Sequence, residues 1–424
     1  MVIGVGVIGA GTVGGGVIEI LTGNTGVIAD KTGAQVVLQH VAELNEALLR
    51  DFDLDNVTVS NDAHALIADP KVDVVCELIG GVEPAKTFML AALNAGKHVV
   101  TANKMLLAKH GVELAEAAIK NGVELRYEAA VAGAIPIIKA LREGLVANHV
   151  RAIYGILNGT CNYILSRMTY DGLEFQQTLD QAIAHGFAET PPDLDINGHD
   201  TAHKCQILAS LAYSTQIDLD AIPVEGITSI THLDVTYARE MGYLIKLLAV
   251  IRKVEGDIEA RVHPALVPED HLLASVRNEF NAVHVESDCA DDTLYYGRGA
   301  GRMPTASAVV ADVVDIARCG SNAATKPFSY THALQVRDIG LLRGRYYLRL
   351  TAEDHPGVLG EVCSILGKHG VSIASCIQKD QEEGEPVHVI LMTHATIESG
   401  VTAALAEIDQ LDFITESTQL LRAL

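Results

Sequence analysis

A glycine-rich turn directly after a short apolar run constrains the fold of this chain more than any other feature. Val2 to Ile8 is apolar, as expected of a parallel strand buried on both faces, and Gly9, Gly11 and Gly14 then complete the pattern GxGxxG. The first glycine suits a tight turn, the second the close approach of a pyrophosphate, and the third close packing of the helix on the strand. The pattern alone can be only a turn, but its position between a strand and a helical run predicts a dinucleotide site.

Strands and helices alternate after this turn. Strands are expected at 34–43, 73–80 and 97–104, with a helix at 86–96. The alternation predicts an α/β domain with a Rossmann-type doubly wound parallel sheet over residues 1–127. Lys104 falls at the carboxyl end of a strand, where ligands of such sheets bind, although a solvated loop lysine would give the same pattern.

An acidic residue is expected after the second strand of a dinucleotide-binding sheet, and Glu43 has that position. Its carboxylate could accept the ribose hydroxyls of NAD and would repel the 2′-phosphate of NADP. The interval from the glycines is longer than the usual ~20 residues because 22–34 is inserted. Because no Arg or Lys adjoins Glu43, the cofactor is expected to be NAD or NADP, with a slight preference for NAD.

The segment 188–204, AETPPDLDINGHDTAHK, places many ionisable residues just before an apolar helical run. Asp200 and Lys204 are spaced i,i+4 and share one helix face, while Glu189 precedes the helix. Carboxylates can bind the ammonium group of a small zwitterionic substrate. A lysine beside them can exchange a proton with an oxygen of the same substrate. Such a lysine needs its pKa lowered by burial or by a second cation, and Lys104 could be that cation.

Two plainer interpretations compete for this segment. Asp200 and Lys204 could form an exposed ion pair worth only ~0.3–0.5 kcal/mol. Alternatively, Asp195, His199 and His203 could bind zinc, although the segment lacks the HExxH pattern.

Composition excludes several classes of partner. The net charge of −23 argues against nucleic acid and anionic membranes, because phosphate binding needs a basic surface. Seven cysteines without a CxxC pair suggest reduced thiols. The N-terminus lacks the basic region of a signal peptide, and no apolar stretch approaches the length of a membrane span, so a cytoplasmic protein is expected.

Taken together, these motifs resemble the homoserine dehydrogenase family, whose members interconvert L-aspartate 4-semialdehyde and L-homoserine. The resemblance runs over roughly residues 3–318, and several of its motifs are specific to that family. They are GAGTVGGGV, ELIGGVEPA, TANKMLLA, YEAAVAGAIPII, GILNGTCNYIL, GFAETPPDLDINGHDTAHK and GRGAGRMPTASAVVADVVDIA.

The resemblance implies roles for individual residues. Lys204 matches the proton-transferring lysine, Lys104 a second lysine that contacts substrate or cofactor, and Glu189 and Asp200 the substrate-binding acids. The stretches implied to contact the cofactor contain Gly9, Gly11, Thr12, Val13, Gly14, Glu43, Lys104, Gly299 and Gly301. A monovalent cation, Na⁺ or K⁺, is implied chiefly on main-chain oxygens of Glu128, Val131, Gly133 and Ile135.

This chain departs from the family pattern at two positions. Pro191 stands where members often have Asp, which puts a secondary polar contact in doubt. Members that prefer NADP carry an Arg near the end of the second strand, and Ala42 supplies none, in agreement with the argument from Glu43.

The middle region, 128–325, is expected to form an α+β substrate-binding and dimerisation domain. Its apolar segments predict an open mixed sheet with one face covered by a second subunit, so a homodimer or homotetramer is expected. The apolar helix at 304–318 should pack back on the first domain.

Residues 345–424 follow the order βαββαβ, which predicts a ferredoxin-like domain. This stretch resembles the ACT domain, a regulatory module that typically binds amino acids. Asp354 and Gly357 precede a helix whose N-terminal N–H groups could bind the carboxylate of an effector. The resemblance implies that L-threonine is this effector; a domain that only dimerises is the alternative.

Two other classes of protein are considered. An acylating semialdehyde dehydrogenase would need a nucleophilic cysteine. Cys161 is the one candidate, but a packing role fits this residue better. A non-catalytic sensor of NAD and an amino acid would not need the proton donor that Lys204 offers.

Overall fold

The structure is a computed structural model that describes residues 2–188, 190–319, 327–328, 330–379 and 386–424. The chain divides into two compact units. The first unit comprises Met1–Gly159, Asp200–Ala221 and Glu279–Leu334. The second unit comprises Thr160–His199, Ile222–Asn278 and Gln335–Leu424.

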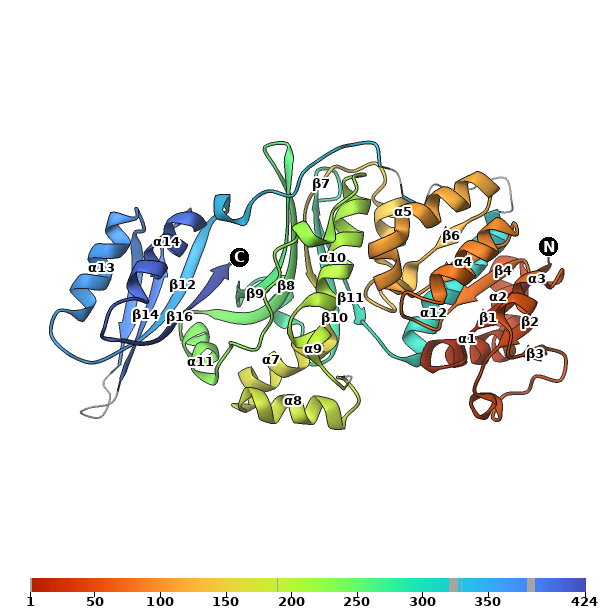
Figure 1. Cartoon of the computed structure of the whole chain (residues 1–424), viewed down its shortest axis with the longest axis horizontal. Helices are drawn as coiled ribbons and strands as arrows, with labels where there is room; N and C mark the ends of the chain where they lie inside the picture. Colours follow the sequence, from red (N-terminus) through yellow and green to blue (C-terminus); the bar gives the residue numbers. More distant parts are fainter. Residues whose placement is uncertain (1, 189, 320–326, 329, 380–385) are drawn as a thin grey trace. The chain divides into compact units, whose positions relative to one another are not determined.

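A six-stranded parallel sheet forms the centre of the first unit's nucleotide-binding part (Figure 1). Its strands, in spatial order, are β3 (Thr58–Ser60), β2 (Gln35–Ala42), β1 (Val2–Ile8), β4 (Val74–Glu77), β5 (His98–Thr101) and β6 (Leu125–Arg126). Every neighbouring pair is parallel. The order reverses direction between β1 and β4, the point where ligands bind outside the carboxyl ends of such sheets. The predicted doubly wound α/β fold is confirmed.

Two helices far apart in the sequence pack together on this sheet. Helix α1 (Thr12–Gly23) lies against α12 (Arg302–Cys319), and both contribute to one apolar core with β1 and β2. Ile18 and Leu21 contact this core from α1, and Val309 and Val313 do so from α12. Helices α3 (Ala63–Ala68), α4 (Ala85–Asn94) and α5 (Lys104–Asn121) pack on the sheet and form a layer in which α4 contacts both α3 and α5.

The glycines of the GxGxxG turn, and Gly16 after it, differ in what their surroundings require. Gly9 has φ +90°, a left-handed conformation that favours glycine. A Cβ on Gly14 would lie 1.8 Å from the carbonyl oxygen of Gly9, so no side chain fits there. A Cβ on Gly16 would lie 2.8 Å from Cβ of Ala306, so this glycine lets α12 pack close. A Cβ on Gly11 would meet nothing within 4 Å, so the chain's own packing does not require glycine there.

The rest of the first unit contains a buried helix and antiparallel strands. Strand β10 (Phe280–Ser287) pairs with β7 (Val150–Ile156) on one side and with β11 (Asp292–Arg298) on the other. Helix α10 (His199–Ala212) is buried along most of its length. Shorter elements are α2 (Thr25–Thr32), α6 (Ile137–Lys139) and a π-turn at Ala140–Gly144.

The second unit contains a mixed sheet. Strands β8 (Tyr243–Val254) and β9 (Asp257–Pro268) are antiparallel, and β9 runs parallel to β16 (Ile414–Ala423). Its helices include α7 (Gly159–Asp171), α8 (Phe175–Ala184), α9 (Asp193–Ile196) and α11 (His232–Glu240). The mixed sheet agrees with the predicted fold class.

The C-terminal residues form a ferredoxin-like βαββαβ domain, as predicted. The order along the chain is β12 (Arg343–Ala352), α13 (Val358–Lys368), β13 (Ile373–Gln378), β14 (Val387–Thr393), α14 (Glu398–Ile408) and β16. In space the strands run β16-β12-β14-β13, and β15 (Thr396–Ile397) pairs with the start of β12. Both helices pack on one face over a single apolar core.

A buried ion pair joins this domain to the rest of the second unit. Arg349 of β12 donates from Nε to Oδ1 of Asp234 on α11 (2.7 Å), and the hydroxyl of Tyr347 donates to the same oxygen (3.0 Å). All three residues are buried, so loss of one partner would leave an uncompensated polar group.

The apolar face expected to be open for a second subunit is not found on β8 and β9. Residues 244–251 and 258–267 are buried on both faces of the sheet. Exposed apolar side chains lie instead on β11, at Leu294 and Tyr296. Their runs of apolar residues are typical of strands buried on both faces, and the second subunit stays a prediction.

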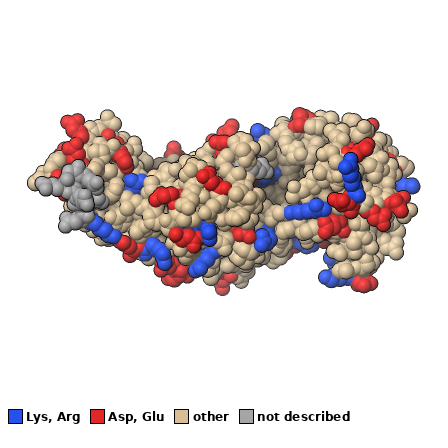
Figure 2. Space-filling view, turned by 90° about the horizontal axis from the view of Figure 1, so that it is seen from below, with Lys and Arg blue, Asp and Glu red and all other residues tan. Residues whose placement is uncertain are grey.

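None of the helices in the described ranges is long and apolar enough to cross a membrane. On the face shown in Figure 2, acidic and basic side chains are interspersed.

Gly14 should tolerate no side chain. Gly14→Ala places its Cβ against the Gly9 carbonyl, and we expect the free energy of unfolding to fall by about 3 kcal/mol. Gly11→Ala is the matched control, because a Cβ there meets no atom. Denaturant unfolding of both variants without ligand checks this, and equal stability of the two would contradict the packing argument.

A buried lysine should make stability depend on pH. Lys246 on β8 is 2% exposed, and Nζ donates to Oδ1 of Asn162 (3.0 Å) and to the carbonyl oxygen of Val276. Burial, and then the charge of Arg277, lower the pKa of Lys246 to about 7. The unfolded chain, with a lysine pKa of about 10.4, binds more protons between these values, so stability rises with pH in this window.

We therefore expect wild type to gain stability over Lys246→Met between about pH 7 and about pH 10, by up to about 1.4 kcal/mol per pH unit. Urea unfolding across this range measures the difference. Lys253→Met, exposed near the end of the same strand, should show no such trend. A difference between wild type and Lys246→Met that does not change with pH would count against this assignment.

Candidate functional site

Polar residues gather at the carboxyl ends of β4 and β5, in the first unit. Glu77, fully buried at the end of β4, accepts hydrogen bonds from the hydroxyl of Thr101 (2.8 Å) and from the N–H of Ile79 (3.0 Å). Asn103 caps α5 by accepting from the N–H of Leu106 (3.1 Å). These contacts fix the loop that starts α5, so the first helical residue, Lys104, has a defined position.

The Lys104 ammonium group reaches a carboxylate from a distant part of the chain. Its Nζ lies 3.2 Å from Oδ1 of Asp200, in the first turn of α10. The other oxygen, Oδ2, accepts from Nζ of Lys204 (2.7 Å) and from Nδ2 of Asn158 (2.9 Å). Lys204 also donates to the carbonyl oxygen of Leu157 (2.7 Å). One carboxylate therefore lies between two lysines, as the i,i+4 spacing and the position of Lys104 suggested.

Burial decides between the two interpretations of the Asp200–Lys204 pair. Both residues are 8% exposed, so they do not form a solvated ion pair on a helix surface. Most residues of α10 beyond its start are apolar and buried. Because they pack in the core, the charged residues at the start of the helix are buried as well. The side chain of Lys104 is more open, at 37% exposed.

The two lysines determine the charge of Asp200. Burial acts to raise the pKa of this carboxyl, but Lys204 and then Lys104 outweigh burial and hold the pKa well below its usual range. The carboxylate thus stays ionised at neutral pH. Such a group can fix the position of an ammonium group but cannot itself supply a proton.

Sequence reasoning missed two supports of this site. Asn158 lies in the motif GILNGTCNYIL and was assigned no role, yet its amide holds Asp200. Glu77 was read as part of a buried strand, and its carboxylate organises the loop before Lys104. A polar turn directly after an apolar strand was the signal available for Asn158.

The remaining residues of the predicted substrate segment are not all brought together. Glu189 lies outside the described residues. Pro191 and His199 are exposed, and Asp195 is half-buried. Cys161 is fully buried and its thiol donates to the carbonyl oxygen of Asp195 (3.2 Å), which agrees with a packing role.

The glycine-rich loop has the geometry that a dinucleotide requires. Gly11 and Thr12 are exposed at the N-terminus of α1, where backbone N–H groups attract a phosphate. Glu43 adjoins the loop: Oε2 accepts from the N–H of Ala10 (2.6 Å) and Oε1 from that of Asn45 (2.8 Å). Its carboxylate is thereby fixed at the end of β2, where a ribose would lie.

The segments near Gly133 and Gly299 lie against each other. A Cβ on Gly133 would be 2.5 Å from the carbonyl oxygen of Gly299, and the N–H of Ala134 donates to the carbonyl oxygen of Arg298 (3.1 Å). Gly301 has φ +118°, a conformation that favours glycine. Val13, at the start of α1, is half-buried.

The residues predicted to surround a monovalent cation share one buried segment. Glu128, Val131 and Ile135 are at most 5% exposed. The Glu128 carboxylate accepts from the N–H groups of Ile138 (2.9 Å) and Lys139 (2.8 Å). Burial raises the pKa of Glu128 to about 7, and these backbone hydrogen bonds oppose the rise.

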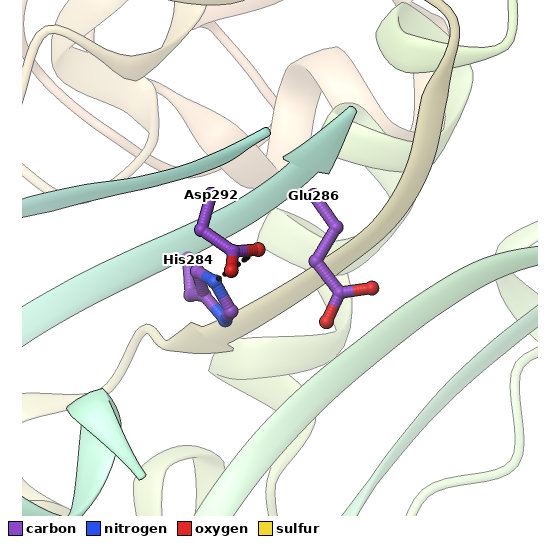
Figure 3. Close-up of side chains that lie close together, drawn as sticks. All are labelled: His284, Glu286 and Asp292. Carbon is purple, nitrogen blue, oxygen red and sulfur yellow. Dashed lines mark hydrogen bonds and ion pairs between the residues drawn. The ribbon is translucent and has the colours of Figure 1, made fainter. Parts of the chain in front are cut away.

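Zinc at Asp195, His199 and His203 is not indicated. Within the described ranges, the one group of three metal-ligating side chains whose ligand atoms lie within 4.8 Å of one another is His284, Glu286 and Asp292. Figure 3 shows them on the β10–β11 pair, where Nε2 of His284 lies 3.2 Å from Oδ1 of Asp292. Asp292 is largely exposed, and its hydrogen bond with His284 accounts for the proximity of these two side chains.

The predicted effector residues precede helix α13 of the C-terminal domain. Gly357 is its N-cap residue, with φ +106°, and Asp354 is exposed three residues earlier. Among the residues that the structure describes, no side chain caps the N-terminus of this helix. Its first N–H groups are therefore not used by a capping side chain.

Comparison with known proteins gives consistent matches along the chain. The family model "Homoserine dehydrogenase, NAD binding domain" matches residues 9–128, "Homoserine dehydrogenase" matches 136–314, and "ACT domain" matches 346–413. The homoserine dehydrogenase of Neisseria gonorrhoeae is 43% identical over 427 residues, covering 99% of this chain and 98% of the relative. That of Pseudomonas aeruginosa is 43% identical and covers 97% of this chain and 96% of the relative.

A solved structure agrees with these matches. The homoserine dehydrogenase of Thiobacillus denitrificans has a TM-score of 0.93 and 42% identity, covering 100% of this chain and 98% of that chain. The match covers the whole of this chain, and so includes the nucleotide-binding sheet and the C-terminal domain. The chain therefore belongs to the homoserine dehydrogenase family of NAD(P)-dependent oxidoreductases.

Proposed function

We propose that this chain interconverts L-homoserine and L-aspartate 4-semialdehyde with NAD(P), and that Lys204 transfers the proton. The observation that carries the proposal is the position of the Asp200 carboxylate between Lys204 and Lys104, at 2.7 and 3.2 Å. This group lies at the carboxyl end of the nucleotide-binding sheet, where a substrate can meet the cofactor.

The bound cofactor supplies hydride transfer to and from carbon 4 of the substrate. When the aldehyde is reduced, negative charge grows on its oxygen, and the ammonium group of Lys204 stabilises and then protonates that oxygen. In the reverse direction the amine of Lys204 takes the hydroxyl proton as carbon 4 loses hydride. Lys104 adds a second positive charge beside the same oxygen.

Asp200 has two roles in this proposal. It fixes the Lys204 ammonium group, which the Leu157 carbonyl also holds, so the proton donor needs little reorganisation during reaction. With Glu189 it also binds the substrate's ammonium group. We also propose the roles that the sequence predicted for the remaining site residues. These roles include binding of a monovalent cation by the segment 128–135.

The C-terminal domain is proposed to bind L-threonine between α13 and its neighbouring loop, with Asp354 and Gly357 near the amino-acid backbone of the effector. Helix α13 begins at Val358 with N–H groups that suit a carboxylate. A second copy of the chain is proposed to cover the exposed Leu294 and Tyr296 on β11, giving a homodimer or homotetramer.

The test of this function is reduction of NAD⁺ and of NADP⁺ by the purified protein with L-homoserine, each with and without L-threonine. We expect turnover with both cofactors or with NAD⁺ alone, and inhibition by L-threonine. Absence of turnover from a folded protein that binds NADH would contradict the enzymatic proposal.

Replacing Lys204 should abolish proton transfer without affecting cofactor binding. We expect Lys204→Arg to keep the positive charge beside Asp200 and yet lower kcat roughly 100- to 10,000-fold, because a guanidinium group does not release its proton near neutral pH. NADH affinity should stay at the wild-type value. Lys204→Ala should show the same loss of kcat, with lower stability because Asp200 loses a partner.

Steady-state kinetics and NADH binding measure these effects. Lys120→Ala, exposed near the end of α5, is the matched control and should behave as wild type. A Lys204→Arg variant with unchanged kcat would rule out the assigned role.

Neutralising Glu43 should weaken the preference for NAD. The carboxylate would accept ribose hydroxyls and repel a 2′-phosphate, so Glu43→Gln should lower the ratio of kcat/KM for NAD⁺ to that for NADP⁺ roughly tenfold. Glu46→Gln, exposed three residues later, should leave the ratio unchanged. If Glu43→Gln also leaves it unchanged, Glu43 does not select the cofactor.

A further inference from the structure

Asn281 is a buried polar residue that the proposed mechanism does not use. It lies on β10 and is 1% exposed. Within the part of the chain that the structure describes, neither Nδ2 nor Oδ1 of its amide has a hydrogen-bond partner. Since an amide can donate two hydrogen bonds and accept two, its whole capacity is unused.

Two glycines make room for this amide. A Cβ on Gly299 would lie 2.0 Å from Nδ2 of Asn281, so only glycine fits beside it. On another side, a Cβ on Gly159 would lie 3.6 Å from Oδ1. The amide therefore lies between the turn at 157–159 and the segment at 299–301.

These two segments belong to different parts of the proposed site. The first contains the Leu157 carbonyl, which accepts from Lys204, and Asn158, whose amide donates to Asp200. The second leads into α12 and is the stretch expected to contact the cofactor. Asn281 thus lies beside both the turn that holds the proton-transfer group and the cofactor segment.

A buried amide without partners lowers the stability of the free protein, because it has given up its hydrogen bonds to water. An apolar side chain of similar size would fill the same space at no such cost. The presence of an amide at this position is therefore explained if the amide forms hydrogen bonds in another state of the protein. One source beside it is the main chain of 299–301, where glycines at both ends allow a peptide group to rotate.

We propose that Asn281 is a positioning residue for hydride transfer. When the cofactor binds, the 299–301 segment turns a peptide group towards Asn281, and the amide then fixes this segment relative to the turn that holds Lys204 and Asp200. The expected effect of Asn281 on turnover rests on the proposed function. Its expected effect on cofactor binding does not depend on the substrate.

The test compares Asn281→Leu and Asn281→Ser with wild type. Leucine has as many side-chain heavy atoms as asparagine and no polar atom, although its methyl groups are bulkier, whereas serine is small and keeps one hydroxyl. Because the free protein loses no hydrogen bond, we expect the melting temperature of Asn281→Leu without cofactor not to fall. NADH affinity and kcat should each fall roughly tenfold or more, with a smaller loss for Asn281→Ser.

NADH binding can be followed by the fluorescence of NADH itself, since the chain contains no tryptophan. Val283→Ala is the matched control: Val283 is buried two residues along the same face of β10, and its loss should lower stability without changing NADH affinity.

Each outcome bears on the proposal. If the melting temperature of both Asn281 variants falls while the folded protein keeps wild-type NADH affinity and kcat, Asn281 is only a packing residue and the proposal is wrong. If wild type binds NADH but does not oxidise L-homoserine, the proposed function fails; weaker NADH binding by the variants would still support the role of Asn281.

Discussion

The buried carboxylate of Asp200 is the constraint on which the proposed site depends. A carboxylate in the interior is costly unless it is paired, and here two lysines and the Asn158 amide compensate its charge. Each partner comes from a different part of the chain. Lys104 begins α5 after β5, Asn158 follows β7, and Lys204 lies one turn along α10. The pairing therefore brings the end of the nucleotide-binding sheet next to the buried helix.

The same interactions explain why the surrounding loops are well defined. Glu77 and Asn103 hold the loop before Lys104, and the Leu157 carbonyl holds the ammonium group of Lys204. A proton donor fixed in this way suits chemistry in which an oxygen gains charge and a proton together. In this account Asn281 extends the arrangement to the cofactor segment, so that one network positions both reactants.

Local patterns predicted much of this structure. The GxGxxG turn, the alternation of strands and helices, and the βαββαβ order each correspond to a confirmed part of the fold, because each is encoded in short-range spacing. The i,i+4 spacing of Asp200 and Lys204 was enough to place both on one helix face.

Burial of that pair was not predictable from spacing, since it depends on what packs around α10. Nor could the sequence indicate that Asn158, Glu77 and Asn281 lie beside the site. Those contacts join residues far apart in the chain. The domain boundaries and the roles of individual site residues stay predictions.

The most direct test of the central claim is a crystal structure of the protein with NAD⁺ and L-homoserine bound. The account predicts that Nζ of Lys204 lies within hydrogen-bond reach, about 2.6–3.2 Å, of the 4-hydroxyl oxygen, with Asp200 still paired to it. A hydroxyl group bound by another side chain, with Lys204 remaining on the Leu157 carbonyl and away from the substrate, would contradict the account.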